Sequence, residues 1–548
     1  MWLRNRFVLL AIAMLPLALL AGCGSSTNNA VAPPSGAFSN TNFNGAYVFS
    51  VSGQDILAAT GGGSIFAMAG SLTACGCTQG TISGGSIDLV DSSGANPGST
   101  IGSNSTYSIT KDGRGFARLF VTTTQGSEEV DIDFVLTSSS HGLIIRYDEA
   151  GTGSGTIDSQ TSVSQPAAGS AFAFSLSGSD LNNNPLSTAG AFTLDGSGNI
   201  STSGSTAGVE DFTYQFPATA YPALPLSGLV QVGSGTAPGG ATLSSSFGKL
   251  TFDVYPIDST HFKLIENDSQ AILVGDVFNQ TSASIPQGNL VFTMSGLDPS
   301  ANLFAAGGLM SSDGSSLIPS GSEDVNDAGT VDGGTNPATP YSFSGSFAQI
   351  PSGSGRFVFT LADFAGGSSF AAYPSSGGIL MMEIDSGLNA GVTGGVALQQ
   401  TSGAALTASQ GYGMNLTGED VIDVTELDEI AQFTTTSTGM TGLVDENDFG
   451  ISTGTSNLSG SYTNGSDGEG SATFNAGLEG MFYYAADSST VLFISTDPGQ
   501  GALGTLEAQT TPSSDSALEH ARALPMPRII PHGHLASGHA KTTLGHAK

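Results

Sequence analysis

Hydrophobic and polar residues alternate in one short pattern that occurs four times along the chain. Each copy places large apolar residues at every second position and then reads Ser or Thr, Gly, any residue, Asp; the copies are 47–55, 172–180, 290–298 and 412–420. Because strand side chains point alternately to two faces, the pattern predicts a strand that ends in a turn. We expect four copies of one β unit, and the residues that mark them are Gly53, Asp55, Gly178, Asp180, Gly296, Asp298, Gly418 and Asp420.

A second repeated signal follows each of these units at its far end. A glutamine followed by Thr-Ser or Thr-Thr stands at Gln160, Gln280, Gln400 and Gln509, and a glycine precedes each glutamine by five residues. The residues between the glycine and the glutamine vary freely from copy to copy. A ligand site would constrain those neighbours, so we interpret the signal as the closing strand of each unit.

The segments between the two signals are typical of hairpins. Asp-Gly turns occur within 194–199, 312–316, 111–115 and 467–470, and short runs of β character such as 249–255 lie between them. Roughly seven or eight strands per unit in hairpin order predict an all-β antiparallel meander, closed as a small barrel or folded as a sandwich. We prefer the barrel, because the first and last strands are the best repeated and closing a barrel would pair them.

These signals divide the chain into seven segments. We expect a signal peptide at 1–22, a flexible tether at 23–42, β repeats at 43–162, 163–282, 283–402 and 403–511, and a His-containing, disordered tail at 512–548.

Composition supports this division and narrows the possible partners. The chain has 548 residues, 77 of them Gly, and only 11% are charged, which favours many short strands over helices. Its 13 basic and 46 acidic residues give a net charge of −33. Such a surface repels phosphate backbones and anionic lipid headgroups, so nucleic acid is excluded as a partner.

The N-terminus carries an export signal. Arg4 and Arg6 precede an apolar run from Phe7 to Leu20, and Leu20-Ala21-Gly22-Cys23 follows. This order is that of a secretory signal, and the last four residues resemble the lipobox of bacterial lipoproteins. That resemblance implies cleavage before Cys23, diacylation of its thiol and attachment to a membrane through the lipid. Gly24, where retained lipoproteins commonly have Asp, favours the outer membrane or cell surface.

Taken as a whole, the chain resembles the Gly/Ser/Thr-rich tandem-repeat lipoproteins of some environmental bacteria. That resemblance implies no established activity. We expect a non-catalytic exported protein for adhesion, binding or envelope structure, with an envelope or extracellular polymer or a protein as partner. The alternative is an enzyme or small-ligand carrier with a site inside one β domain, which should then show a polar cavity lined by converging carboxylates or His.

Candidate catalytic residues are few. Ser452 lies in a G-x-S-x-G match, 450–454, but the flanking sequence does not predict the strand and helix of a nucleophile elbow. His141 and His261 stand at matching positions in the first two units, where we expect them in or beside a turn. No catalytic residue is therefore assigned.

Metal and thiol chemistry is the remaining possibility. Runs of carboxylates at 210–211, 323–327 and 445–448 predict a shared acidic loop, either solvated or holding calcium; no other cofactor is expected. Cys75 and Cys77 form a C-x-C pair, which outside the cytoplasm favours a local turn disulfide over free thiols or a metal or redox site.

Overall fold

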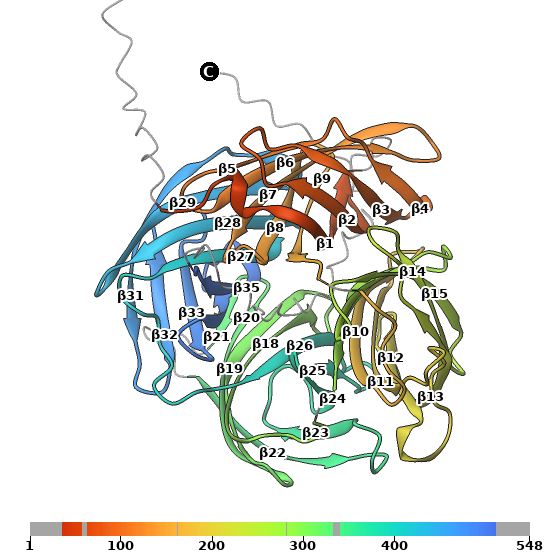
Figure 1. The fold of residues 1–548 in the computed structure, drawn as a ribbon. Coiled ribbons are helices and arrows are strands. Elements are labelled where there is room, and N and C mark those ends of the chain that lie inside the picture. Colours follow the sequence, from red (N-terminus) through yellow and green to blue (C-terminus); the bar gives the residue numbers. More distant parts are fainter. Residues whose placement is uncertain (1–35, 57–62, 162, 281, 333–339, 511–548) are drawn as a thin grey trace, which may run out of the picture. The chain divides into compact units, whose positions relative to one another are not determined.

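The computed structural model describes residues 36–56, 63–161, 163–280, 282–332 and 340–510. These residues form four antiparallel β sheets and two short 3-10 helices, η1 (Asn40–Asn42) and η2 (Gly204–Thr206), and the sheets follow one another along the chain (Figure 1). We call the four sheets repeats 1 to 4. The predicted all-β meander is confirmed. No helix among the described residues is long and apolar enough to cross a membrane.

Repeats 1 and 2 contain nine and eight strands. The strands of repeat 1 are β1 (Asn44–Ile56), β2 (Gly63–Cys75), β3 (Ile82–Asp91), β4 (Gly94–Ile101), β5 (Thr106–Ile109), β6 (Arg114–Thr122), β7 (Ser127–Leu136), β8 (His141–Asp148) and β9 (Gly151–Ser159). Those of repeat 2 are β10 (Ala171–Asp180), β11 (Pro185–Thr193), β12 (Gly208–Tyr214), β13 (Thr219–Gln231), β14 (Gly239–Ser244), β15 (Lys249–Pro256), β16 (His261–Glu266) and β17 (Ala271–Asn279).

Repeats 3 and 4 contain nine strands each. The strands of repeat 3 are β18 (Gln287–Leu297), β19 (Leu303–Asp313), β20 (Leu317–Asp327), β21 (Thr330–Asp332), β22 (Tyr341–Gln349), β23 (Phe357–Ala362), β24 (Ser369–Ser375), β25 (Gly378–Glu383) and β26 (Val392–Gln399). Those of repeat 4 are β27 (Gly411–Asp420), β28 (Thr425–Thr435), β29 (Gly439–Asp448), β30 (Ile451–Ser452), β31 (Ser456–Asn464), β32 (Glu469–Phe474), β33 (Gly480–Ala485), β34 (Thr490–Ser495) and β35 (Gln500–Ala508).

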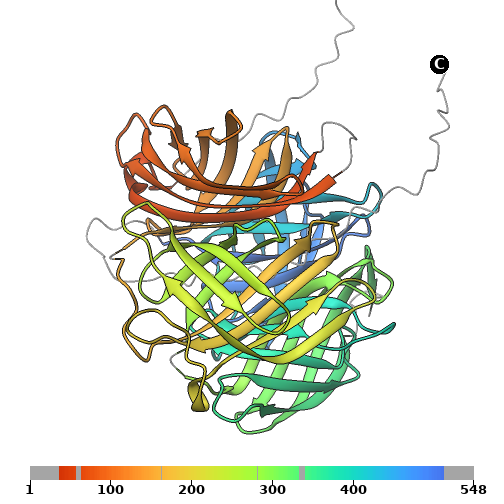
Figure 2. The same ribbon diagram turned by 90° about the vertical axis from the view of Figure 1, so that its right-hand side faces the viewer.

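In every repeat the first strand pairs with the last, and eight strands close into a ring (Figures 1 and 2). Repeat 2 is a closed barrel of eight strands, whereas pairings β4–β6, β19–β20 and β28–β29 close the other three. A short ninth strand (β5, β21 or β30) lies alongside each of these. The expected barrel, rather than the sandwich, is therefore the architecture.

The repeated glycines allow this closure because the first and last strands approach very closely. A Cβ on Gly155 would lie 1.7 Å from the carbonyl oxygen of Ser50, and one on Gly275 would lie 2.1 Å from that of Ser175. Gly178 adopts φ +154°, and a Cβ there would lie 1.8 Å from the carbonyl oxygen of Ile272. The glycines found by sequence comparison are thus positions where any side chain would force the two strands apart.

The interior of each repeat is filled by apolar side chains, and a second set of apolar clusters joins successive repeats. One such cluster combines Val48 of repeat 1 with Tyr255 of repeat 2, and others join repeats 2 and 3, 3 and 4, and 4 and 1. Strands such as β1 and β27 are therefore buried on both faces along much of their length. The contacts between repeats run in a closed cycle, with repeat 4 packed on repeat 1.

Candidate functional site

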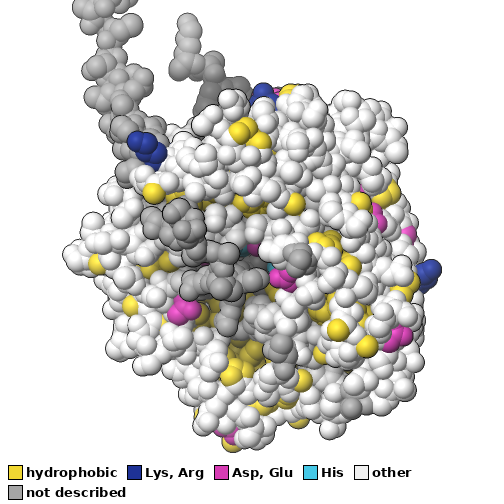
Figure 3. All heavy atoms as spheres, viewed as in Figure 1, with side chains coloured by type: hydrophobic (Ala, Val, Ile, Leu, Met, Phe, Trp, Pro, Cys, Tyr) yellow, Lys and Arg dark blue, Asp and Glu magenta, His cyan; other side chains and the backbone are white. Residues whose placement is uncertain are grey.

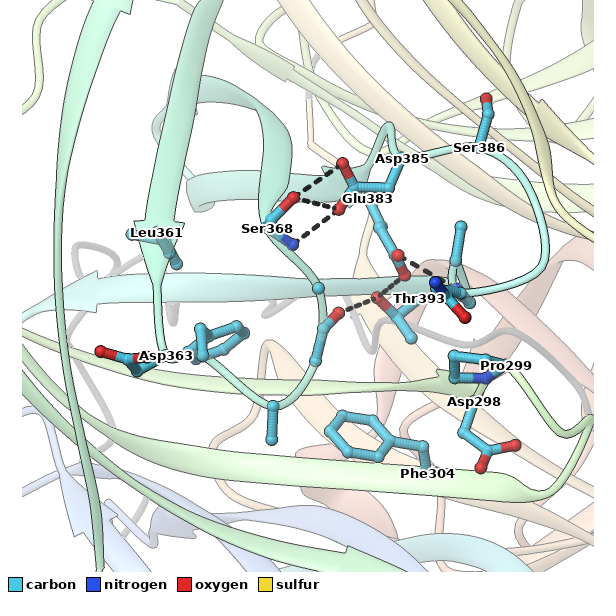
Figure 4. Close-up of a pocket in the computed structure, with 17 residues that line it drawn as sticks. Asp298, Pro299, Phe304, Leu361, Asp363, Ser368, Glu383, Asp385, Ser386 and Thr393 are labelled. Atoms are coloured by element: carbon cyan, nitrogen blue, oxygen red, sulfur yellow. Dashed lines mark hydrogen bonds between the residues drawn. The ribbon is translucent and has the colours of Figure 1, made fainter.

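The candidate site is a pocket of about 410 Å³ at one end of repeat 3 (Figure 4). Its wall comes from the turn after β18, the loop 363–368 after β23 and the segment 384–391 between β25 and β26. Asp298, Asp363, Glu383 and Asp385 all line it, and Phe304 and Phe364 supply its aromatic surface. Among the described residues of the lining there is no Lys, Arg or His. The pocket is therefore rich in hydrogen-bond acceptors.

Glu383 lies at the C-terminal end of β25 and is only 1% exposed. It accepts hydrogen bonds from the Gly391 N–H (3.1 Å) and the Thr393 hydroxyl (2.9 Å). Burial raises the pKa of Glu383 to about 7. Gly367 has φ +128°, and a Cβ on it would lie 2.9 Å from the carboxyl carbon of Glu383, so the loop can pass the carboxyl group only as glycine.

Two other acids on the pocket wall, Asp385 and Asp298, are held by local donors. Asp385 accepts hydrogen bonds from the N–H (2.6 Å) and hydroxyl (3.0 Å) of Ser368 and from the N–H of Ser369 (3.0 Å). Asp298 closes its turn by accepting from the N–H groups of Ser300 (2.8 Å) and Asn302 (2.7 Å). The carboxyl groups are thus fixed before any ligand arrives.

A pocket of about 260 Å³ occupies the equivalent end of repeat 1. The strand registers match Phe66 to Phe304 and Arg146 to Glu383. Arg146 forms ion pairs with Asp55 and with Asp148 (3.0 Å), and its guanidinium lies 4.7 Å from the centre of the Phe66 ring. The same barrel end therefore carries a cation in repeat 1 and a carboxyl group in repeat 3.

Asp180 and Asp420 match Asp298 in position and in role. Asp180 accepts hydrogen bonds from the N–H groups of Asn182 and Asn184, both at 2.8 Å, and Asp420 accepts from that of Ile422 at 2.7 Å. Asp55 differs, because it pairs with Arg146.

The four repeated glutamines lie one residue beyond the last strand, and each side chain reaches the following repeat. The side-chain amide of Gln160 donates to the carbonyl oxygen of Pro256, and that of Gln280 to those of Gly355 and Pro374. Gln400 donates to Asp467 and Ala485 in the same way.

Gln509 completes the cycle. Its amide donates to the carbonyl oxygens of Asp112 (2.7 Å) and Leu136 (2.9 Å) of repeat 1. Thr510 adds a backbone hydrogen bond to the carbonyl oxygen of Thr137. The glutamine thus clamps one repeat to the next, a role that lies beyond the closing of its own unit.

The acidic runs are not loops, and that sequence interpretation is wrong. They lie in β12, β20 and β29, and their buried members Glu210, Asp211, Glu323, Asp324 and Asp445 are all under 9% exposed. These strands show no alternation of hydrophobic and polar residues in the sequence, because both of their faces are buried, one inside the barrel and one between repeats. Among the described residues, no group of three or more His, Cys, Asp or Glu side chains could hold a metal ion.

One aspartate of this strand in each repeat contacts the next repeat. The registers make Asp88, Asp211, Asp324 and Asp445 equivalent. Asp88 accepts a hydrogen bond from the Tyr255 hydroxyl (2.7 Å), and Asp324 accepts one from the Tyr484 hydroxyl (2.8 Å). Asp211 accepts hydrogen bonds from the Tyr373 hydroxyl and from two nitrogens of Arg356 (2.5 and 2.6 Å). Asp445 accepts one from Arg114 (2.8 Å).

His141 belongs to the contact between repeats 4 and 1. It is 1% exposed and lies between Asp158 (2.6 Å) and Glu507 of repeat 4 (3.0 Å). Burial alone would lower the pKa of His141, but these two carboxylates raise it to about 10. His261 pairs with Asp276 (2.7 Å). Both histidines begin a strand directly after a turn, and each ring contacts at least one carboxyl group.

The remaining sequence candidates are separate from these sites. Cys75, at the end of β2, and Cys77 form a disulfide. Ser452 lies exposed in the two-residue strand β30, and the next element is strand β31 where a nucleophile elbow would have a helix. Cys23 and the histidines of the tail lie outside the described residues.

The surface carries fewer acidic side chains than the net charge of −33 suggests. On the face shown in Figure 3, charged side chains are isolated among uncharged polar and backbone atoms. Eighteen Asp and Glu side chains among the described residues are buried, whereas His141, Lys263 and Arg356 are the only buried basic ones. Much of the acidity therefore lies inside the protein.

Comparison with protein-family models gives no match, and comparison with curated proteins gives none. One solved structure that is similar to the chain is described as "The Structure of Intact Ap-TbpB (N and C lobes)". It shares 9% identity at a TM-score of 0.15, over 68% of this chain and 84% of that one.

Proposed function

We propose that the chain is an exported, lipid-anchored, non-catalytic protein that carries a small ligand in the pocket of repeat 3, because a polar cavity lined by carboxyl groups inside one β domain is what the alternative of a ligand carrier requires. The observation that carries the proposal is a cavity of about 410 Å³ whose carboxyl groups are already held in place by backbone and hydroxyl donors. Preorganised acceptors in a concave site are the usual basis of small-ligand recognition.

The lining indicates the class of ligand. Its charged groups are all acidic, so an anionic ligand would meet repulsion and would find no cationic partner among the described residues of the wall. A ligand with several hydrogen-bond donors, such as a polyol, a sugar of an envelope or extracellular polymer, or an amine, matches the acceptors.

Binding is tested by calorimetric titration of the full chain with a panel of sugars, polyols and amines, with and without calcium. We expect a ligand whose affinity falls about tenfold or more in Asp385→Asn, since each lost charge-assisted hydrogen bond contributes about 1.5 to 3 kcal/mol. Asp91→Asn, in the smaller pocket of repeat 1, is the matched control and should leave that affinity unchanged. Equal loss in both variants, or no binding by the panel, would refute the proposed site.

The anchor is tested separately. The lipobox-like residues 20–23 support diacylation of Cys23 and attachment at the outer membrane or cell surface. Mass spectrometry of the mature N-terminus should find the lipid, and Cys23→Ser should release the protein in soluble form. An unmodified terminus would refute the anchor and leave the pocket unaffected.

One observation favours a second candidate, an enzyme. A buried carboxyl group with a pKa of about 7, Glu383, is suited to general acid catalysis and lies in the same pocket as Asp385. If the ligand is also a substrate, Glu383→Gln should abolish turnover while ligand binding is retained. Binding without any chemical change in the wild type would leave the non-catalytic function.

A further inference from the structure

Strand β20 carries two successive buried carboxyl groups that face opposite ways. Glu323, 0% exposed, accepts a hydrogen bond from the N–H of Ala365 (2.7 Å), which belongs to the wall of the repeat 3 pocket. Asp324, 2% exposed, accepts one from the Tyr484 hydroxyl of repeat 4. Adjacent strand residues point to opposite faces, so one carboxyl group holds the pocket loop and the other holds the neighbouring repeat.

Within the part of the chain that the structure describes, no basic side chain is found among the charged neighbours of Asp324. Glu469 of β32 is the cross-strand neighbour of Tyr484, whose hydroxyl donates to Asp324, so the two acids lie at the same contact. The other nearby titratable groups are Glu323 and the exposed Asp467. Arg356 is the one basic residue between Lys263 and His520, and its side chain is engaged by Asp211 of repeat 2. Two carboxyl groups can form a hydrogen bond with each other only when one of them carries a proton.

The equivalent contact between repeats 2 and 3 is built differently. The register places Glu469 opposite Tyr484 in repeat 4. In repeat 3, Phe357 pairs with Ala372, so Arg356 and Tyr373 stand one step further along the same two strands and are the equivalents of Glu469 and Tyr484. Where one contact has an aspartate, a tyrosine and an arginine, the other has an aspartate, a tyrosine and a glutamate. A proton must therefore supply the positive charge that the arginine supplies elsewhere.

We propose that the contact between repeats 3 and 4 is a proton-operated latch, held by one proton shared between Asp324 and Glu469 and opened when that proton leaves. When the latch opens, β20 moves. Glu323 on the same strand is hydrogen-bonded to Ala365, so the movement also displaces the loop 363–368 of the pocket. This inference goes beyond the proposed function, because the latch operates whether or not the pocket takes a ligand.

The direction of the pH dependence follows from burial. Burial raises the pKa of both Asp324 and Glu469, and it raises the pKa of Glu323 to about 8. An acid whose pKa is higher in the folded state contributes stability that is complete below its unfolded pKa and is lost as the pH rises through the folded value. The latch is therefore closed in acid and opens at roughly pH 6 to 9.

Hydrogen exchange of the full chain, followed by mass spectrometry and corrected for the intrinsic pH dependence of exchange, measures the opening. Between pH 6 and 9 we expect protection of peptides from β20 and β33 to fall by about tenfold or more, because one unit of pKa shift is a tenfold change in the equilibrium. Peptides from β12 and β24, at the contact between repeats 2 and 3, should keep their protection. Equal loss at both contacts, or no loss at either, would overturn the latch.

Two substitutions at one position complete the test. Glu469→Arg places here the residue type found at the equivalent positions of repeats 1 and 3, and Glu469→Gln imitates the protonated acid. Both should keep β20 and β33 protected at pH 9, where the wild type is open. Asp467→Asn, an exposed neighbour, is the matched control and should behave as the wild type. If Glu469→Arg does not fold, the test rests on Glu469→Gln alone. A loss of protection in β20 and β33 with rising pH like that of the wild type would then refute the proposal.

Discussion

The contact between repeats 2 and 3 and the contact between repeats 3 and 4 place different chemistry on the same scaffold. In the first, the guanidinium of Arg356 neutralises the fully buried Asp211 through two nitrogens, and the Tyr373 hydroxyl donates a further hydrogen bond to it. In the second, the buried Asp324 meets Tyr484 and a second acid, Glu469. The backbone register is shared, so the comparison isolates the effect of one side chain. It teaches that a repeated interface can be held by a permanent charge or by a proton.

Removing the permanent charge has the largest expected effect. Arg356→Gln leaves Asp211 buried without a cation, and we expect a loss of about 3 to 5 kcal/mol of the free energy of unfolding at pH 7. Urea denaturation measures the loss. Arg118→Gln is the control: the Arg118 side chain is 43% exposed, and we expect little change. Similar losses in both variants would contradict the importance of the buried contact.

The contact between repeats 4 and 1 should resist high pH where the contact between repeats 3 and 4 does not. The pKa of His141 is raised, so its contribution to stability is complete below its unfolded value and lost as the pH rises through about 10. His141→Gln leaves Asp158 and Glu507 facing each other, and we expect a loss of about 3 kcal/mol at pH 7. Calorimetric unfolding from pH 5 to 10 measures both effects. An unchanged profile in the variant would show that the histidine is not charged in the fold.

The glutamine clamps sharpen the comparison because they are the same at both contacts. Gln280→Ala and Gln400→Ala each remove two hydrogen bonds to carbonyl oxygens of the next repeat. We expect about 1 to 3 kcal/mol for each, with no dependence on pH between 5 and 9. The measurement is urea denaturation at both pH values. A pH-dependent difference between the two variants would mean that the clamp and the carboxyl pair are not independent.

The tyrosine hydroxyl at the proton-held contact has the smallest expected effect. Tyr484→Phe removes a single hydrogen bond to Asp324 and keeps the ring that packs over Gly307. We expect a loss of about 1 kcal/mol in thermal unfolding at pH 6. The ring itself matters more, because a Cβ on Gly307 would lie only 2.3 Å from it. Stabilisation by Tyr484→Phe would show that the hydroxyl is poorly satisfied.

The repeated closing signal was easier to locate in the sequence than to interpret. Gly155 and Gln160 were visible because the four copies share them, and the glycine has the predicted place in the closing strand. The side chain of the glutamine binds the following repeat. A comparison of the four copies cannot show this, because a residue repeats in the same way whether its contact lies within its own unit or in the next one. The carboxylates of 323–324 were read as a loop for a related reason: a strand buried on both faces has no alternation to reveal it.

The pocket was out of reach of sequence reasoning. Asp298 was found as a turn residue, but Glu383 and Asp385 lie in a segment with no repeated motif, and the loop that carries Gly367 is specific to repeat 3. A cavity depends on which loops happen to meet at one barrel end. The one available signal was the acid at 383, at the end of an apolar run where a solvent-exposed turn would be expected.

The sequence alone determined the local features of this protein: four units, their all-β meander and the glycines at which strands meet. These depend on periodicity and on backbone sterics, which act over a few residues and leave a direct pattern. Only the tertiary structure decided which acids are buried, which repeat each glutamine clamps, and that repeat 4 returns to repeat 1. Those properties arise because burial and distance change the free energy of a charge, and neither quantity is written in the order of the residues.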